Sequence, residues 1–156
     1  MQSHLRFQLL LLLSVALNLI GTASAEPEPS SDPVVAKLND SIGRFFDGVA
    51  KGDVSKSYTE LLKDSQLFRQ SDALKALIDK TKEIEKKYGK YRGHDRIDAK
   101  RIGKDLILVR CLYKCDEFPV VWYFSFYHDF KHSDADNSSW IVVSVRFDTD
   151  LELLGM

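Results

Sequence analysis

The chain has 156 residues, of which 22 are Lys or Arg and 23 are Asp or Glu, so its formal net charge at pH 7 is −1. A chain of this length can form one hydrophobic core but not two. The nearly balanced charge gives no reason to expect nucleic acid as a partner.

The first 25 residues have the features of a secretory signal peptide. Arg6 precedes an apolar run over residues 7–20, and the small residues Ala23 and Ala25 stand just before Glu26. The run is shorter than the roughly 18 to 20 residues that a spanning helix needs. We therefore expect cleavage before Glu26, a periplasmic or secreted location and no stable membrane anchor. An uncleaved anchor is the alternative.

Cleavage would leave 21 basic and 23 acidic residues, a net charge of −2, because only Arg6 is charged in the removed segment. Residues 26–32 are polar and rich in Pro, which indicates a flexible leader. We expect residues 33–156 to form a single domain.

Three helices are predicted first. Asp32 followed by Pro33 is a helix start, and apolar residues then recur every three or four positions as far as Val49. Gly52 ends this helix, and Asp53 can cap a short second one. Ser71 can cap a third, whose apolar stripe comprises Leu74, Leu77, Ile78, Ile84 and Tyr88 before Gly89.

After Gly89 the apolar period changes from about 3.6 to 2. It predicts a weak strand near residues 95–101 and strong strands at 106–113, 120–128 and 140–147. Short connections favour an antiparallel meander. The fold expected is therefore α+β, with three N-terminal helices packed on one face of a curved, cone-like, four-stranded antiparallel sheet.

A turn centred on Asp116 and Glu117 predicts how the two middle strands pair. Cys111 then lies opposite Trp122, with two further apolar pairs beyond it. With Ile141, Val143, Val145 and Phe147 these residues form a charge-free face, which we expect the helices to cover. The opposite face carries Leu108, Arg110, Leu112, Val121, Tyr123, Ser125, Tyr127, Trp140, Val142, Ser144 and Arg146.

This order of elements resembles the nuclear-transport-factor-2-like superfamily, which includes ketosteroid-isomerase-like enzymes. The stretches VVAKLNDSIGRFFDGVAKGDVSKSYTELL, ALKALIDKTKEIEKKYG and WIVVSVRF carry the resemblance, which covers about residues 34–154 and is closest to small exported members of unknown role. It implies a cone-like sheet around helices, a dimer through the sheet in many members, and a pocket in the cone mouth of some. The enzymes use a buried acid as base, but no acid here lies in a stretch that matches a catalytic signature.

The mixed face is the candidate binding surface, because Tyr, Trp and Arg combine apolar area with hydrogen-bond donors. We assign ligand binding to Arg110, Tyr123, Tyr127, Trp140 and Arg146. The two guanidinium groups could hold a carboxylate or sulfate. The alternative is structural, with both groups stacked on aromatic neighbours or paired with Asp148.

Two groups of charged residues could bind an ion or a surface but also have a simpler interpretation. His128, Asp129, His132, Asp134 and Asp136 fit no known metal spacing and are typical of a solvated loop. Residues 75–104 hold eleven Lys or Arg against five Asp or Glu, which suits a solvated helix face or, alternatively, an anionic cell-envelope surface.

Cys111 and Cys115 would lie roughly 13 Å apart in an extended strand, too far for a disulfide unless a turn begins at Cys115. We therefore expect a buried, inert Cys111 and a partly exposed Cys115. A disulfide is the alternative.

No nucleophile turn, phosphate loop or metal motif is present, so we expect no catalytic residue, metal or cofactor. The function expected is an exported, non-catalytic domain that binds a small molecule or a protein partner, including a second copy, through the mixed face. The alternative is a small isomerase or hydrolase with a carboxylate buried in a cone-shaped pocket, where burial would raise its pKa.

Overall fold

The structure is a computed structural model and describes residues 32–130 and 140–152. The predicted signal peptide and nearly all of the leader lie outside the described residues. Within those two ranges, no helix is long and apolar enough to cross a membrane.

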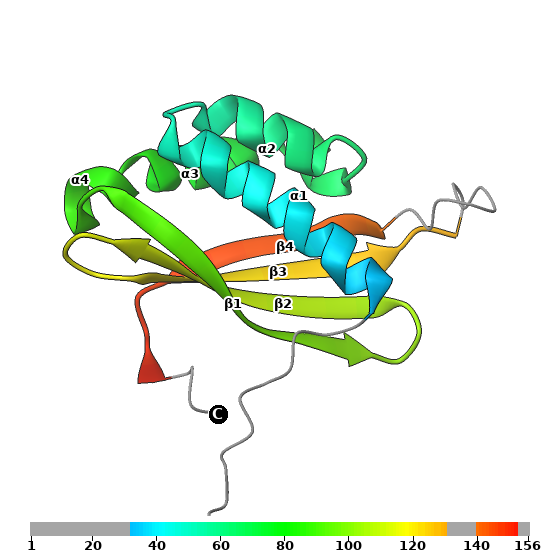
Figure 1. Ribbon diagram of the computed structural model, residues 1–156. Helices are drawn as coiled ribbons and strands as arrows, with labels where there is room; N and C mark the ends of the chain where they lie inside the picture. The colour runs from blue at the N-terminus through cyan, green and yellow to red at the C-terminus, as the bar shows by residue number, and fades with distance from the viewer. Residues whose placement is uncertain (1–31, 131–139, 153–156) are drawn as a thin grey trace, which may run out of the picture.

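The chain forms its helices first and its strands afterwards. The helical part comprises α1 (Pro33–Ala50), α2 (Val54–Leu62), the 3-10 turn η1 (Gln66–Arg69), α3 (Ser71–Lys82) and α4 (Ile84–Tyr88). The strands are β1 (Tyr91–Ile102), β2 (Leu106–Cys115), β3 (Val120–His128) and β4 (Trp140–Asp148). All helices lie on one face of the sheet (Figure 1). The predicted α+β class, with helices preceding an antiparallel sheet, is confirmed. The third predicted helix is interrupted at Glu83, so its last apolar residues belong to α4.

The first helix begins where the sequence predicts. The Asp32 carboxylate accepts a hydrogen bond of 2.8 Å from the Val34 N–H, and Pro33 occupies the first helical position. Arg101 at the end of β1 donates to the other oxygen of Asp32 at 2.5 Å. Asp32 therefore joins the helix layer to the sheet as well as capping α1.

Asp32→Ala is expected to lower the free energy of unfolding at pH 7 by about 1 kcal/mol, through loss of the cap and of the Arg101 contact. The hydrogen bond from Arg101 holds the pKa of Asp32 below its usual range. The stabilisation that the Asp32 carboxylate provides is thus fully present above the ordinary Asp pKa of about 3.9. It is lost as the pH falls through the lowered pKa of the folded state.

Urea unfolding of wild type and variant at pH 7 and at about pH 2 measures this effect, and the difference in free energy should narrow at the lower pH. Asp40→Ala, which removes an exposed carboxylate from the same helix, is the control. An Asp32→Ala difference that is equally large at both pH values would contradict the role assigned to this carboxylate.

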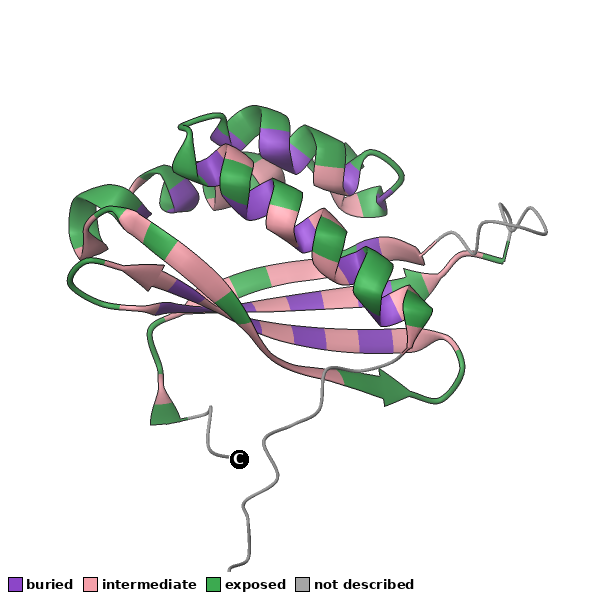
Figure 2. Cartoon of the chain, in the orientation of Figure 1, coloured by how far each residue is buried: buried purple, intermediate pink, exposed green. Residues whose placement is uncertain are grey.

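The sheet is an open antiparallel meander in the order β1-β2-β3-β4, so β1 and β4 are edge strands. The predicted pairing of the middle strands is confirmed, because Cys111 faces Trp122, Val109 faces Phe124 and Ile107 faces Phe126. Buried and partly exposed residues alternate along β2, as Figure 2 shows. The core lies between this side of the sheet and the helices.

Aromatic rings fill the centre of the core. Phe45 and Phe46 of α1 approach the Trp122 ring edge-on, with ring centroids 5.4 and 5.5 Å away. Phe147 of β4 stacks on the same ring at 4.4 Å, and Trp122 itself is fully buried. Such pairs add about 0.5 to 1.5 kcal/mol each to the effect of their buried area.

The predicted faces of β4 are wrong in its first half. The strand carries one extra residue opposite the Ser125–Phe126 step of β3, which is a β-bulge. Val142 is therefore buried in the core, whereas Val143, predicted to face the helices, is 41% exposed. The second half follows the prediction, since Val145 and Phe147 pack against the core.

Both cysteines are free, with Cys111 buried and Cys115 partly exposed, as expected from the extended geometry of β2. Burial raises the pKa of Cys111 to about 12 and that of Cys115 to about 11. Neither thiol is therefore activated as a nucleophile at neutral pH.

Candidate functional site

The side of the sheet away from the helices, termed here the outer face, presents side chains in rows that cross all four strands. Strand pairing aligns Ile102, Leu106, Tyr127 and Ile141 in one row, termed the apolar row. A second row, termed the charged row, contains Asp98, Arg110, Tyr123 and Arg146. Four of the five predicted site residues thus share the outer face.

The two arginines of the charged row already contact other residues of the chain. Arg110 donates from Nε to Asp98 Oδ2 at 2.9 Å, and this hydrogen bond raises the pKa of Arg110. The Arg146 guanidinium lies over the Tyr123 ring, 4.3 Å from its centre. One guanidinium is therefore ion-paired, with Asp98 instead of Asp148, and the other is stacked on an aromatic ring.

Tyr123 stands between these arginines and is partly buried. Its hydroxyl makes no hydrogen bond within the described part of the chain. Burial, with a further contribution from Asp148, raises the pKa of Tyr123. The phenol therefore stays protonated at neutral pH and acts as a donor.

Trp140, the fifth predicted site residue, does not lie on the outer face. It pairs with His128, and the bulge directs its ring to the helix side, where it packs against the core. The Arg101 guanidinium lies 5.3 Å from the ring centre. The prediction failed because it assumed an unbroken alternation along β4, and the extra residue reverses the faces of everything before it.

The two ends of the outer face differ in exposure. Val121 is fully buried although it lies on this face, next to the point where the chain leaves β4 and turns to the same side of the sheet (Figure 1). In the apolar row, by contrast, Tyr127 is 42% exposed and Ile102 is 44% exposed. The outer face is thus buried at the end near Val121 and exposed to solvent at the end formed by the apolar row.

A catalytic carboxylate would need an apolar pocket. No Asp or Glu among residues 32–130 and 140–152 is buried, and the buried polar side chains there are Ser57, Ser65 and Thr81. The same ranges contain no cluster of three His, Cys, Asp or Glu that could hold a metal ion. His132, Asp134 and Asp136 of the metal-site hypothesis lie outside the described residues.

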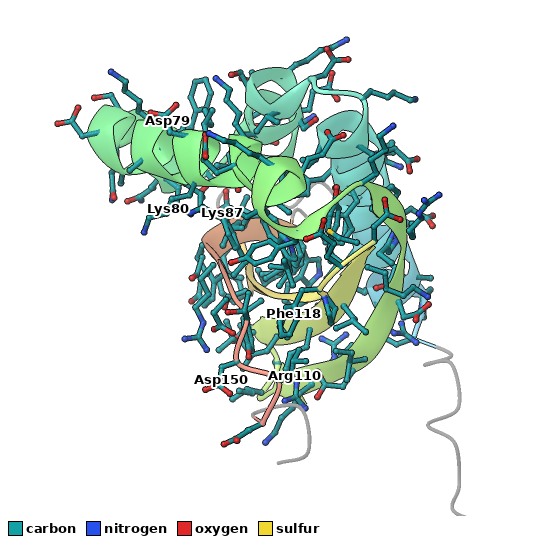
Figure 3. All side chains as sticks on the ribbon, turned by 90° about the vertical axis from the view of Figure 1, so that its left-hand side faces the viewer. Asp79, Lys80, Lys87, Arg110, Phe118 and Asp150 are labelled. Carbon is teal, nitrogen blue, oxygen red and sulfur yellow. The ribbon has the colours of Figure 1, made fainter. Side chains whose placement is uncertain are left out.

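A groove of about 340 Å³ lies between α3 and β4 and is termed the α3–β4 groove. Its walls are mainly apolar, with Lys80 and Arg146 among the lining residues. Figure 3 shows Lys80 and Lys87 on the underside of the helices, toward the sheet. The volume is within the range of small-ligand sites.

The groove was not predicted from the sequence, because the whole apolar stripe of the third helix was expected to face the core. Leu74, Leu77 and Ile78 are in fact only partly buried, and the only buried residue of α3 is Thr81. The third helix has many charged residues around a short apolar stripe, and this composition could have indicated that the helix is only partly buried.

Comparison with protein-family models, with curated proteins and with solved structures finds no match for this chain. The resemblance to the nuclear-transport-factor-2-like superfamily therefore stays a prediction.

Proposed function

We propose that this protein is a non-catalytic binding domain that contacts a protein partner through its outer face. The observation that carries the proposal is the apolar row, which crosses all four strands and leaves Ile102 and Tyr127 substantially exposed. Contiguous exposed apolar surface with a polar surround is typical of protein interaction sites.

The charge around the row favours a second copy of the chain as the partner. Within the described ranges, four cations and four anions lie on or beside the outer face, namely Lys100, Arg110, Lys114, Arg146, Asp95, Asp98, Asp148 and Asp150. A two-fold interface brings each patch against its own copy, so a face with equal numbers of both signs can be complementary to itself. A polyanion or an anionic membrane would require an excess of cations.

A small anion held by Arg110 and Arg146 is the weaker alternative, because one of these groups is paired with Asp98 and the other is stacked on Tyr123. An isomerase or hydrolase is weaker still, since such an enzyme needs a buried base and the described carboxylates all reach solvent.

Light scattering coupled to size-exclusion chromatography of the purified protein tests the proposal. We expect a mass twice that of one chain, and Tyr127→Glu should weaken self-association by about tenfold or more, because it places an unpaired charge in the apolar row. Phe118→Glu is the matched control, since Phe118 is a similarly exposed aromatic residue in the β2–β3 turn. A wild-type protein that remains monomeric at high concentration would contradict the second-copy interface.

A further inference from the structure

The α3–β4 groove exposes the backbone edge of a strand. Residues 143–147 are consecutive in β4, and all five line the groove. Side chains of consecutive strand residues point to opposite faces of a sheet, so a surface touched by all five runs along the edge of the strand. Among the residues that the structure describes, β4 has β3 as its only neighbour in the sheet, so within them the backbone groups on this edge have no partner strand.

Only the first half of this edge is covered by other described elements. Ser65, which precedes η1, donates a side-chain hydrogen bond to the Val142 carbonyl oxygen. Within residues 32–130 and 140–152, no other hydrogen bond from a helix or turn to β4 is found. No other part of the described chain therefore pairs with the edge beyond Val142 along the groove.

The opposite wall offers apolar surface. Leu74 and Leu77 on the underside of α3 are partly buried, and Ala73 and Ala76 beside them are exposed. Phe147 closes the groove at the end of β4. An extended segment lying against β4 would direct alternate side chains onto this helix wall.

The charged side chains that line the groove itself, Lys80 and Arg146, are both positive. Lys80 lines the groove, Lys87 lies next to Phe147 beyond it, and neither forms an ion pair within the described part of the chain. Asp79 and Glu83 border the same region, but Glu83 is paired with Lys86. An acidic group on the bound segment would meet these lysines.

We propose that the α3–β4 groove binds an extended peptide with alternating apolar residues and an acidic end, which adds to β4 as a fifth strand and places its acidic end at Lys80. This site shares Arg146 with the outer face but lies along the edge of the sheet, and it does not depend on the function proposed for the outer face. A fatty acid would share the apolar and anionic chemistry, but the open backbone edge of β4 favours a ligand with its own N–H and C=O groups.

Fluorescence anisotropy on the full chain tests this proposal with a labelled octapeptide of alternating Val and Thr that ends in two Glu. Saturable binding is expected. Replacing the central Val of the peptide by Pro, which removes an N–H and disfavours strand pairing, should weaken binding by about tenfold or more. Replacing its two Glu by two Lys should weaken binding by at least about fivefold.

Matched variants of the protein locate the site. Ala76→Trp, which fills the groove from an exposed helical position, should weaken binding by about tenfold, whereas Ala36→Trp on exposed α1 surface should leave it within about twofold. Lys80→Glu should weaken binding, and Lys75→Glu, on the same helix but outside the groove, should not. Circular dichroism confirms that each variant is folded.

Amide hydrogen exchange followed by NMR distinguishes strand addition from other binding. Bound peptide should slow exchange of edge amides within residues 143–147. Three outcomes overturn the proposal: no saturable binding of the octapeptide, protection confined to β2 and β3, or binding of oleate at the groove with none of the peptide. Repeating the titration with Tyr127→Glu separates this result from self-association, since loss of the outer-face interface should leave peptide binding unchanged.

Discussion

Replacing Trp122 by alanine is expected to lower the free energy of unfolding by about 3 to 5 kcal/mol, the largest effect of any single substitution considered. The indole is fully buried and contacts rings from α1, β3 and β4, including Phe147 at 4.4 Å. Removing it leaves a cavity at the point where the helix layer meets the sheet, and rigid aromatic neighbours cannot collapse into that space completely.

Trp122→Phe is the informative control. Its loss should be clearly smaller, because one ring is retained and because the Trp122 Nε1–H is buried without a hydrogen-bond partner in the described structure. Urea unfolding followed by far-ultraviolet circular dichroism measures both variants. If Trp122→Ala costs no more than Trp122→Phe, the indole is not the centre of the core.

Thr81→Val is expected to lower the free energy of unfolding by about 1 to 3 kcal/mol although the two side chains have nearly the same shape. The Thr81 hydroxyl donates to the Leu77 carbonyl oxygen at 2.8 Å and lies 2.9 Å from the Tyr58 hydroxyl. Because the Thr81 proton goes to Leu77, the Tyr58 hydroxyl is the donor in the second bond. Valine would leave that fully buried phenol without an acceptor.

A double-mutant cycle with Tyr58→Phe measures this interaction. Tyr58→Phe alone should cost less than Thr81→Val, because Thr81 keeps its bond to Leu77. The double variant should lose less stability than the sum of the single losses, since no orphan phenol remains. Strictly additive losses in urea unfolding would show that the hydrogen bond between α2 and α3 does not contribute as the geometry indicates.

Features fixed by neighbouring residues could be predicted from the sequence. The start of α1 follows from Asp32 and Pro33, whose side chains determine the local backbone. The pairing of β2 with β3 follows from a short turn and from the alternation of buried and partly exposed residues along β2, which a shift of one residue would reverse. Both of these predictions are confirmed.

The first half of β4 could not be predicted in the same way. Its residues Trp140, Ile141, Val142 and Val143 are all apolar, so no polar residue marks which of them faces water. The bulge depends on how the strand meets β3 and on the Ser65 contact to Val142, which comes from a residue 77 positions away in the chain. A pattern within the strand contains neither kind of information.

In the candidate sites, too, the features set by local alternation could be predicted, and those set by contacts between distant residues could not. Arg110, Tyr123, Tyr127 and Arg146 share the outer face because alternation holds in β2, β3 and the second half of β4. The sequence did not show which charges would pair. Asp98 reaches Arg110 because the two residues lie directly opposite in the β1–β2 pairing, whose register shifts between Arg96 and Asp98. The α3–β4 groove depends on the distance at which α3 stands from an edge strand, and no periodicity encodes that distance.

The extra residue in β4 also determines which insertions and deletions the strand can accept. It sets the two halves of the strand out of phase, so that Val142 and Phe147, five positions apart, both point into the core. Val143 is the extra residue, so losing it would leave both halves facing as they do now, whereas losing a residue from either half would reverse the faces of the rest of that half. Residues added to the connection before Trp140 would leave this phase intact, so evolution can vary the length of that connection far more freely than the length of the strand.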